Sequence, residues 1–523
     1  MTESEVFINQ VGYRPQDNKN VFVSAEAKSG ADDFEICEKS GGKTVFTGRL
    51  ISAPQDLDCG GEYFTGDFSE VQKAGEYFVK IGKNQSFSFK ISDNVYDDLT
   101  LSTLKYFTDS RCGQGICHTG VAEVYGSENG EMKNVQGGWH DAGDYGRYVV
   151  AGTKAVMDLL LGYKKAPSAF KDFALLDEVR FELAWLLQMQ RKDGAVYHKI
   201  SCYHFCPFVM PQEEKNQLVL APVSTAATAD FAGCLAYAST FYTDIDKAFA
   251  ENLLNAAIKA QNYLFSHDDE LYINPPEITT GGYGDRDVRD ERYFALCSLY
   301  AVTGEKNYLT QAIKLRQDKA KDKPDSQHPW NNGWQEGFGW SFVSGYGTEI
   351  LLEKSDQLEP ELLSEIHKGI ISQAEQYLEN TNTSAFKYCS KFIMWGSNGL
   401  ACDLAHILLL AWEITGRKEF YDASKAQIDY ILGCNPLNFC YVTGAGTKSP
   451  VNPHHRPSGA SGKVYPGMLA GGPCSGLLDA YAKEHLTGRA PLKCYADEQP
   501  SYSTNEVAIY WNSALVYVLA KLL

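Results

Sequence analysis

The sequence has no excess of basic residues. Its 48 Lys and Arg residues are outnumbered by 66 Asp and Glu residues, which gives the 523 residues a formal charge of −18. Because nucleic-acid binding depends on clustered cations that neutralise phosphates, an acidic chain without a basic stripe is not expected to bind nucleic acid. A hydrophobic content of 44% with 22% charged residues is typical of a folded protein.

Long apolar runs are also missing. The longest, around Ile407–Trp412, is far shorter than the roughly 18 residues of a membrane span, so we expect no membrane association. The first residues, Met1–Glu5, lack the basic and apolar parts of a signal peptide. We therefore expect a cytoplasmic protein, or a secreted one if a signal was removed. The 14 cysteines are scattered, which favours free thiols or metal ligands over a disulfide framework.

The first 93 residues differ from the rest in their hydrophobic pattern. Apolar and polar residues alternate in short runs such as Glu76–Ile81 and Ser86–Ile91, with Gly, Asp, Asn and Lys between the runs. A period of two with frequent turn residues is typical of antiparallel strands. The pattern predicts a small β-sandwich over residues 1–93.

Residues 94–523 have a helical pattern instead, and no strand-rich stretch returns after residue 100. Helices are predicted over 178–190, 229–242, 307–316, 399–415, 419–432 and 505–523. Paired helices with long loops take roughly 60–75 residues, so this segment has room for six pairs. We predict a mainly α protein whose helices close into a barrel.

Two groups of carboxylates stand out. Gly137–Tyr145 (GGWHDAGDY) sets Asp141 and Asp144 among glycines, which let both acids point one way, although an acidic turn or a calcium loop would fit as well. Glu506 stands at the expected start of an apolar helix, where an acid often only complements the helix dipole. Together they fit glycoside hydrolysis, which uses one carboxyl group as an acid and a second carboxylate on the other face of the sugar.

The sequence resembles glycoside hydrolase family nine, the cellulase family with an (α/α)6 barrel. The resemblance covers nearly the whole chain, and residues 1–93 resemble the immunoglobulin-like module that precedes the barrel in one branch of the family. It rests on six segments in the family's order: Gly137–Tyr145, Ser224–Phe231, Gly281–Arg292, Trp395–Gly399, Asn452–Ser458 and Asn505–Ala508.

The resemblance implies catalytic roles for three residues. Asp144 would be the general base that activates water, Asp141 would help to hold it, and Glu506 would be the general acid. The family inverts the anomeric configuration, so the base and the acid should stand roughly 6.5–9.5 Å apart.

Substrate-binding residues are implied in the same way. His454 and Arg456 match family positions that contact the glucosyl units beside the scissile bond, and Tyr502 matches an aromatic residue near the cleavage site. Trp330 and Trp395 could stack on sugar rings, as could Trp334 and Trp340, although core packing explains any single tryptophan equally well.

Four residues form a candidate zinc site. Cys112, Cys117, His118 and His140 supply two thiolates and two imidazoles, which would fill a tetrahedral structural site. A chance cluster of cysteines and histidines is the alternative. Some members of the family carry zinc at matching places, with a longer interval between the cysteines than this chain has.

A second metal is suggested by the acidic segment Asp285, Asp287, Asp290 and Glu291. Hard oxygen ligands at this density suit calcium, and a solvated acidic loop is the alternative. The matching region binds calcium in several members of the family. No organic cofactor is expected.

The sequence therefore predicts a monomeric, inverting endo-β-1,4-glucanase that acts on cellulose, related β-glucans or cello-oligosaccharides. The alternative on the same scaffold is an exo-acting cellodextrinase, cellobiohydrolase or exo-β-glucosaminidase. Two other classes remain open, namely a zinc-dependent hydrolase with His140 as a catalytic ligand and a catalytically silent carbohydrate-binding protein.

Overall fold

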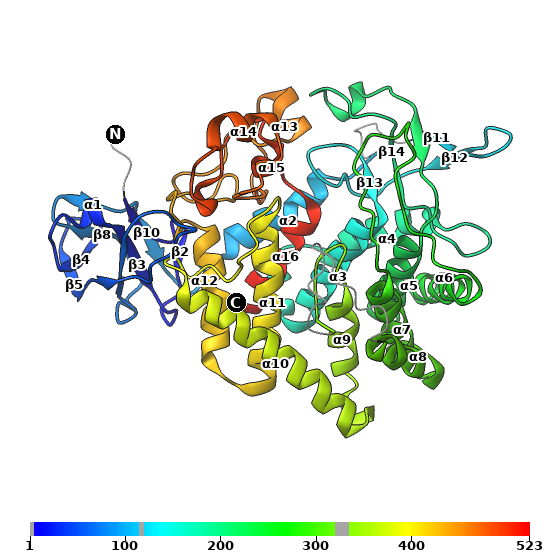
Figure 1. Cartoon of the computed structure of the whole chain (residues 1–523), viewed down its shortest axis with the longest axis horizontal. Coiled ribbons are helices and arrows are strands. Elements are labelled where there is room, and N and C mark those ends of the chain that lie inside the picture. The colour runs from blue at the N-terminus through cyan, green and yellow to red at the C-terminus, as the bar shows by residue number, and fades with distance from the viewer. Residues whose placement is uncertain (1–4, 114–119, 319–333, 523) are drawn as a thin grey trace. The chain divides into compact units, whose positions relative to one another are not determined.

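The computed structural model describes residues 5–113, 120–318 and 334–522. The chain forms two compact units (Figure 1). The first comprises Met1–Tyr106, Ala166–Phe173 and Ala374–Leu523, and the second comprises Phe107–Lys165 and Ala174–Gln373. No helix among the described residues is long and apolar enough to cross a membrane.

The first unit begins with the predicted β-sandwich. One sheet has the order β1-β3-β7-β6, and the other has the order β2-β10-β8-β4-β5 with β9 paired to β8. The strands are β1 Val6–Phe7, β2 Gly12–Tyr13, β3 Asn20–Ser24, β4 Asp33–Glu38, β5 Thr44–Arg49, β6 Ile51–Ser52, β7 Tyr63–Asp67, β8 Gly75–Ile81, β9 Asn84–Gln85 and β10 Phe89–Ile91, with the short helix α1 at Ala25–Lys28. All pairs are antiparallel except β2 and β10.

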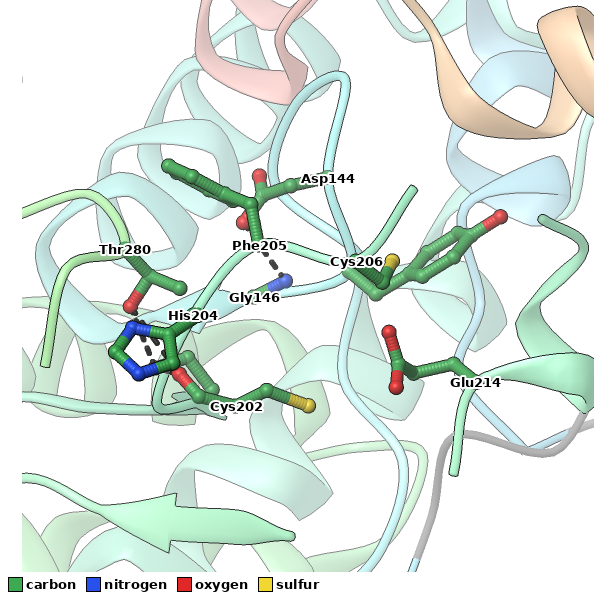
Figure 2. A pocket seen from close by; sticks show the side chains of 10 residues that line it. Asp144, Gly146, Cys202, His204, Phe205, Cys206, Glu214 and Thr280 are labelled. Atoms are coloured by element: carbon green, nitrogen blue, oxygen red, sulfur yellow. Dashed lines mark hydrogen bonds between the residues drawn. The ribbon is translucent and has the colours of Figure 1, made fainter. Parts of the chain in front are cut away.

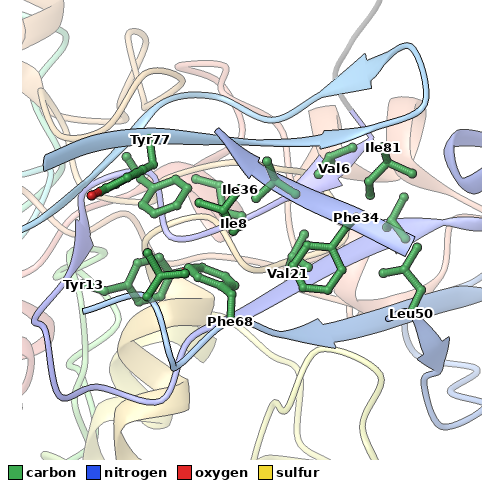
Figure 3. Close-up of a cluster of buried hydrophobic side chains, with 14 of the residues drawn as sticks. Val6, Ile8, Tyr13, Val21, Phe34, Ile36, Leu50, Phe68, Tyr77 and Ile81 are labelled. Carbon is green, nitrogen blue, oxygen red and sulfur yellow. The ribbon is translucent and has the colours of Figure 1, made fainter. Parts of the chain in front are cut away.

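The sandwich core confirms the alternating pattern. Along β8, Tyr77, Val79 and Ile81 are buried while their neighbours are more exposed. Figure 3 shows these strands contributing to one cluster, in which Phe34 is fully buried. Burying a side chain of this size stabilises the fold by about 1.5–3 kcal/mol, so the cluster accounts for the alternation seen in the sequence.

Specific contacts attach the sandwich to the C-terminal part of the same unit. Asn9 donates from Nδ2 to Asp429 Oδ1 at 2.8 Å, and Ser384 donates to Asp56 Oδ2, also at 2.8 Å. The ring of Phe386 lies against three aromatic rings of the sandwich. The sandwich is therefore docked through buried polar and aromatic contacts.

Helices make up most of the remaining first unit. They are α2 Asp97–Asp109, α10 Pro360–Thr383, α11 Ser397–Thr415, α12 Lys418–Ile431, α13 Arg456–Ser461, α14 Ala480–Leu486, α15 Tyr502–Asn505 and α16 Ile509–Leu522, where α2 and α10 run on into the second unit. Helix α11 packs against α12 and α16. It ends at Gly416, whose φ of 69° is a left-handed conformation that glycine adopts without strain.

The second unit is built on packed helices. They are α3 Val149–Lys165, α4 Leu175–Met189, α5 Thr225–Tyr242, α6 Lys247–Ser266, α7 Arg289–Thr303, α8 Lys306–Gln317 and α9 Ser344–Leu352. Helix α5 packs against α3, α6 and α7, and α7 also packs against α8 and α9. Helices α4, α5 and α8 confirm the periodicity of the sequence.

The second unit also contains a sheet that the sequence did not predict. Its order is β12-β11-β15-β14-β13, formed by β11 Gly120–Val124, β12 Met132–Val135, β13 Arg147–Tyr148, β14 Lys199–Cys202 and β15 Leu218–Leu220. The expectation that no strand-rich stretch follows residue 100 was therefore wrong. These strands are two to five residues long, and apart from the hairpin of β11 and β12 they pair between separate segments, so they leave little local alternation to detect.

Cysteines in the described residues are buried. Cys59, Cys234, Cys297, Cys389, Cys434, Cys440, Cys474 and Cys494 are free thiols in the interior. Burial raises the pKa of the Cys440 thiol to about 12, so this thiol stays protonated and unreactive at neutral pH. The expectation of free thiols rather than a disulfide framework holds for these residues.

Candidate active site

The loop that carries the two aspartates is fixed through its backbone groups, which pack and form hydrogen bonds as follows. Gly137 and Gly138 have φ values of 79° and 81°, and a Cβ atom on Gly138 would lie 2.6 Å from the ring of Trp185. Trp139 donates its backbone N–H to Glu182 Oε2 at 2.6 Å. Asp141 donates its N–H to the carbonyl of Gly146 at 2.9 Å. These contacts fix the loop, so the two glycines are structurally required.

Asp144 lies just before β13 and is 7% exposed. Its Oδ2 accepts hydrogen bonds from the backbone N–H of Gly146 at 3.1 Å and from the hydroxyl of Tyr148 at 3.2 Å. Both donors stabilise the ionised carboxylate, as a general base requires.

Asp141 is more deeply buried, with 1% of its surface exposed. Tyr283 donates a hydrogen bond to its Oδ2 at 2.5 Å, and the ring of Trp340 lies 4.9 Å from that of Tyr283. Burial, followed by the charge of Asp144, raises the pKa of Asp141 well above its ordinary value. Of the two carboxylates, Asp141 is therefore the one whose charged form is disfavoured by burial.

A buried lysine stands close to this pair. Lys199 on β14 donates from Nζ to Thr280 Oγ1 at 3.0 Å and to the carbonyl of Gly281 at 2.5 Å, and its ammonium lies 5.4 Å from the centre of the Tyr148 ring. Burial lowers the pKa of Lys199 to about 7, while the charge of Asp144 opposes that shift. Lys199 thereby ties the loop that leads to Tyr283 to the strand beside Asp144.

A small pocket of about 10 Å³ opens beside Asp144 (Figure 2). Its walls include Cys202 at the end of β14, and Phe205, Cys206 and Glu214 from the segment that follows β14. Phe205 is 49% exposed, which is unusual for a phenylalanine. A space of this size is about what a single water molecule needs.

Sequence reasoning missed several of these neighbours. Tyr148 lies only four residues after Asp144, and Tyr283 belongs to the quoted segment Gly281–Arg292, so both were within reach of the motifs. Lys199 and Phe205 carried no comparable signal, because the unpredicted sheet brings them to the aspartates.

Glu506 occupies a different position from the one expected. The predicted helix over 505–523 is interrupted, because α15 ends at Asn505 and α16 begins at Ile509. Glu506 lies in the extended connection, with φ −69° and ψ 159°, so it does not belong to the first turn of α16. The reading of Glu506 as a residue that only complements a helix dipole therefore does not apply.

The backbone around Glu506 is fixed by distant segments. Its N–H donates to the carbonyl of Tyr502 at 3.2 Å, and its carbonyl accepts from the N–H of Gly471 at 2.8 Å. A parallel bridge pairs it with His454. Just upstream, Asp479 Oδ2 accepts the N–H of Ser503 at 3.0 Å.

The adjacent Asn505 is held from three sides. Its Nδ2 donates to the carbonyl of Asn452 at 2.8 Å and to Asp497 Oδ1 at 2.9 Å, and its Oδ1 accepts from the hydroxyl of Tyr495 at 2.6 Å. The residue before the proposed acid is thus fully engaged.

The predicted substrate residues of the first unit gather around Glu506. The ring of Tyr502 lies 5.8 Å from that of His454 and 5.3 Å from that of Trp395, which is 43% exposed. His454 donates from Nδ1 to the carbonyl of Gln499 at 2.7 Å. Arg456 is buried at the start of α13. Trp330 lies outside the described residues.

The candidate zinc ligands are described only in part. The N–H of Cys112 donates to the carbonyl of Gly138, and the N–H of His140 donates to that of Ser110, so Cys112 and His140 lie on neighbouring, paired segments. Cys117 and His118 lie outside the described residues. The zinc site stays a prediction.

The candidate calcium ligands separate into two groups. Asp287 forms an ion pair with Arg289 at 2.6 Å. Asp285, Asp290 and Glu291 are at most 4% exposed, and Asp230 on α5 joins them. Burial, followed by the charge of Asp290, raises the pKa of Asp230, whose two carboxylate oxygens have no hydrogen-bond partner in the described part of the chain.

A group of buried carboxylates suits a divalent cation, so the residue types fit calcium. In residues 5–113, 120–318 and 334–522, no three His, Cys, Asp or Glu side chains are arranged to hold an ion as they stand.

Comparisons with known proteins cover the whole chain. Residues 1–86 match the model of the cellulase N-terminal ig-like domain, and residues 96–519 match that of glycosyl hydrolase family 9. A cellodextrinase of Butyrivibrio fibrisolvens is 34% identical over 99% of this chain and 100% of its own.

Solved structures agree. A single mutant of the thermostable endoglucanase of Alicyclobacillus acidocaldarius superposes with a TM-score of 0.89 at 33% identity, over 99% of both chains. A Zn-binding triple mutant of the family 9 endoglucanase J30 gives a TM-score of 0.89 at 26% identity, over 97% of this chain and 99% of that one. The likeness confirms the predicted fold class, a mainly helical (α/α)6 barrel preceded by an immunoglobulin-like sandwich. The chain is a member of glycosyl hydrolase family 9.

Proposed function

We propose that this glycoside hydrolase cleaves β-1,4-glucosidic bonds of cellulose-type glucans and cello-oligosaccharides in a single inverting step. The observation that carries the proposal is the buried, doubly hydrogen-bonded Asp144 in a chain that matches family 9 over residues 96–519. The names of the two relatives, a cellodextrinase and an endoglucanase, support this substrate class.

In this mechanism Asp144 is the general base. The hydrogen bonds from Gly146 and Tyr148 orient its carboxylate, and the adjacent pocket has room for about one water molecule. Asp144 removes a proton from that water as the water attacks the anomeric carbon. Asp141, fixed by Tyr283, helps to orient the base and the water.

Glu506 is the general acid in this proposal. Its carboxyl group donates a proton to the glycosidic oxygen as the bond to the anomeric carbon breaks. An inverting enzyme requires roughly 6.5–9.5 Å between acid and base, which leaves room for the water and the sugar. The buried hydrogen bonds around Asn505 support such a role, because they fix the backbone from which Glu506 projects.

His454, Arg456, Tyr502 and Trp395 are proposed to bind the glucosyl units next to the scissile bond. Imidazole and guanidinium groups donate hydrogen bonds to hydroxyls, and the exposed Trp395 beside Tyr502 offers aromatic faces to pyranose rings. Trp330 is proposed to contribute a further ring.

Zinc, held by Cys112, Cys117, His118 and His140, is proposed to be structural. A closed tetrahedral site of this kind would tie the segment around Cys112 to the catalytic loop. Such a site has no open position, which argues against a zinc-dependent hydrolase with His140 as a catalytic ligand. The Zn-binding mutant of J30 shows that zinc binding occurs in at least one engineered relative.

Calcium is proposed to be held by Asp285, Asp290 and Glu291, with Asp230 in place of Asp287. The ion would supply positive charge to carboxylates that burial otherwise disfavours in their ionised form.

We propose endo action. The exo action of a cellodextrinase is kept as the alternative, because relatives with both kinds of name cover the chain equally well. A chromatographic time course on cellopentaose, polymeric glucan and chitosan oligomers tests this. Endo action predicts a rapid fall in the viscosity of the polymer and mixed products, whereas exo action predicts one short product from the start. Freshly formed product should be the α-anomer by NMR, and β product would refute the inverting mechanism.

A further inference from the structure

A large cleft of the first unit lies between the sandwich and the C-terminal segment. This cleft, which we call the junction cleft, is bounded by Phe7, Tyr63 and Phe87 of the sandwich and by Phe439 and Tyr495 of the C-terminal segment. Its volume is about 1180 Å³. Sites for small molecules usually measure roughly 300–1,000 Å³, so this cleft has the size for a short oligomer rather than a single sugar.

The two walls of the junction cleft are held at a fixed spacing. Lys493 of the C-terminal segment donates from Nζ to the carbonyl of Gly60 at 2.8 Å, and the N–H of Lys448 donates to Gln10 Oε1 at 2.9 Å. Because these bonds bridge the sandwich and the C-terminal segment, the cleft is formed before any ligand enters.

The charges along the cleft argue for a neutral ligand. Carboxylates are supplied by Glu5, Glu26, Glu62 and Asp497, and cations by Lys448, Arg489 and Lys493. A polyanion would meet the carboxylates and a cationic oligomer would meet the cations. A neutral chain of hydroxyl groups can donate to the former and accept from the latter, while aromatic rings such as the half-buried Phe87 pack against its C–H faces.

Two residues of the cleft wall also belong to the network around the proposed acid. Tyr495 donates its hydroxyl to Asn505, and Asp497 accepts from Asn505 and from the backbone N–H of Asn452. Asn505 directly precedes Glu506. A ligand in the cleft would therefore contact residues that position the acid.

We propose that the junction cleft is a second binding site for a neutral β-linked gluco-oligosaccharide, formed jointly by the sandwich and the C-terminal segment. The identity of the sugar rests on the proposed function, whereas the size, preformed walls and mixed charge of the site do not. The sandwich then binds part of the substrate in addition to its docking contacts.

Hydrogen exchange of the full-length Glu506→Gln variant with cellotetraose tests the proposal. The sandwich peptides that contain residues 60–63 and 85–87 should exchange at least about threefold more slowly at saturating cellotetraose. Phe87→Ala should weaken this protection about tenfold in apparent affinity, and Gln85→Trp, which fills the cleft, should abolish it. Ile51→Ala, an exposed change on the same sandwich, should leave it intact.

Three results would overturn the proposal: no protection of these peptides, protection that survives both cleft variants, or protection by a cationic chitosan tetramer but not by cellotetraose. Hydrolysis by the unmodified chain separates this proposal from the function itself. Protection without hydrolysis would support the second binding site and reject the glucanase function. Hydrolysis without protection would support the glucanase function and reject the second binding site.

Discussion

The segments that carry the two proposed catalytic groups are stabilised in contrasting ways. The loop that carries Asp144 supplies part of its own support, since Gly137–Tyr148 contains the glycines, the carboxylates and the donors Gly146 and Tyr148, while Glu182 and Ser110 fix its backbone from outside. Glu506 is held by segments far apart in the sequence, among them Asn452–His454, Gly471 and Asp479. Much of the support of Asp144 can therefore be predicted from one short motif, whereas the remote contacts that position Glu506 cannot.

The largest effect is expected from removing either catalytic group. Asp144→Asn and Glu506→Gln should each lower kcat on cello-oligosaccharides by roughly 10³-fold or more, because each removes one proton transfer. A cellobioside with a dinitrophenolate leaving group needs no protonation, so it should restore activity to Glu506→Gln alone. Steady-state kinetics measure both effects.

Thermal unfolding of these two variants provides the control. Each change is nearly isosteric, so the transition should stay close to that of the unmodified chain. Substantial residual activity on cellopentaose in either variant, or equal rescue of both by the activated substrate, would contradict the assigned roles.

Loss of zinc should destabilise the segment that carries Asp144 and leave the segment around Glu506 unaffected. Metal analysis should find about one zinc per chain, and Cys112→Ser should remove it. At a zinc concentration 1,000 times Kd, the lost binding corresponds to about 4 kcal/mol of stability. Limited proteolysis should then cut near Gly137–Tyr145 and leave the Glu506 segment intact. A purified chain without zinc would rule out this site.

Calcium should act on the same unit through Asp230. Calcium at 100 times Kd should stabilise the unmodified chain by about 2.7 kcal/mol. In a chelator, Asp230→Asn should be more stable than the unmodified chain, because it removes a buried carboxylate without partners. Differential scanning calorimetry with and without calcium measures both. Equal stabilisation of the two proteins by calcium would exclude Asp230 as a ligand.

Lys199 predicts a pH dependence of stability. Its pKa is about 7 in the folded chain, below the ordinary value near 10.5, so between pH 7 and 10 the unfolded chain binds the additional proton. Stability relative to Lys199→Met should therefore rise with pH in this window, by up to about 1.4 kcal/mol per pH unit. Denaturant titrations at several pH values measure the difference, and parallel curves would mean that Lys199 stays protonated.

The smallest expected effect is a difference in pH dependence between a variant near Asp144 and a matched variant near Glu506. Tyr148→Phe removes a hydrogen bond to the proposed base Asp144, and a hydrogen bond to a carboxylate favours its charged form. The acidic limb of kcat/KM should then move to higher pH, with a loss of about tenfold near neutral pH.

Tyr495→Phe is the matched change on the acid side, since it removes a hydrogen bond to Asn505 rather than to a carboxylate. It should lower kcat without moving the acidic limb. A shift of the limb in both variants would show that it does not report on Asp144 alone.

Features that depend on local patterns could be predicted from the sequence, and features that depend on long-range contacts could not. The sandwich was predictable because its strands alternate over five to seven residues, and long amphipathic helices such as α11 and α12 were predictable from their period. The sheet β11–β15 was not, because its strands are short and most of its pairs join separate segments of the chain. Glu506 was found by its motif but assigned to the wrong element, because the break before Ile509 depends on the partners Gly471 and His454.

The docking of the sandwich has a consequence for biosynthesis. The sandwich is complete by Ile91, yet its partners include Ser384, Phe386 and Asp429, which are translated about 300 residues later. At 5–20 residues per second, this interval lasts roughly 15–60 s. During that time Phe7 and Phe22, which later pack against Phe386, have no partner from the C-terminal part. Until then the nascent chain lacks the ring that covers Phe7 and Phe22 in the folded protein.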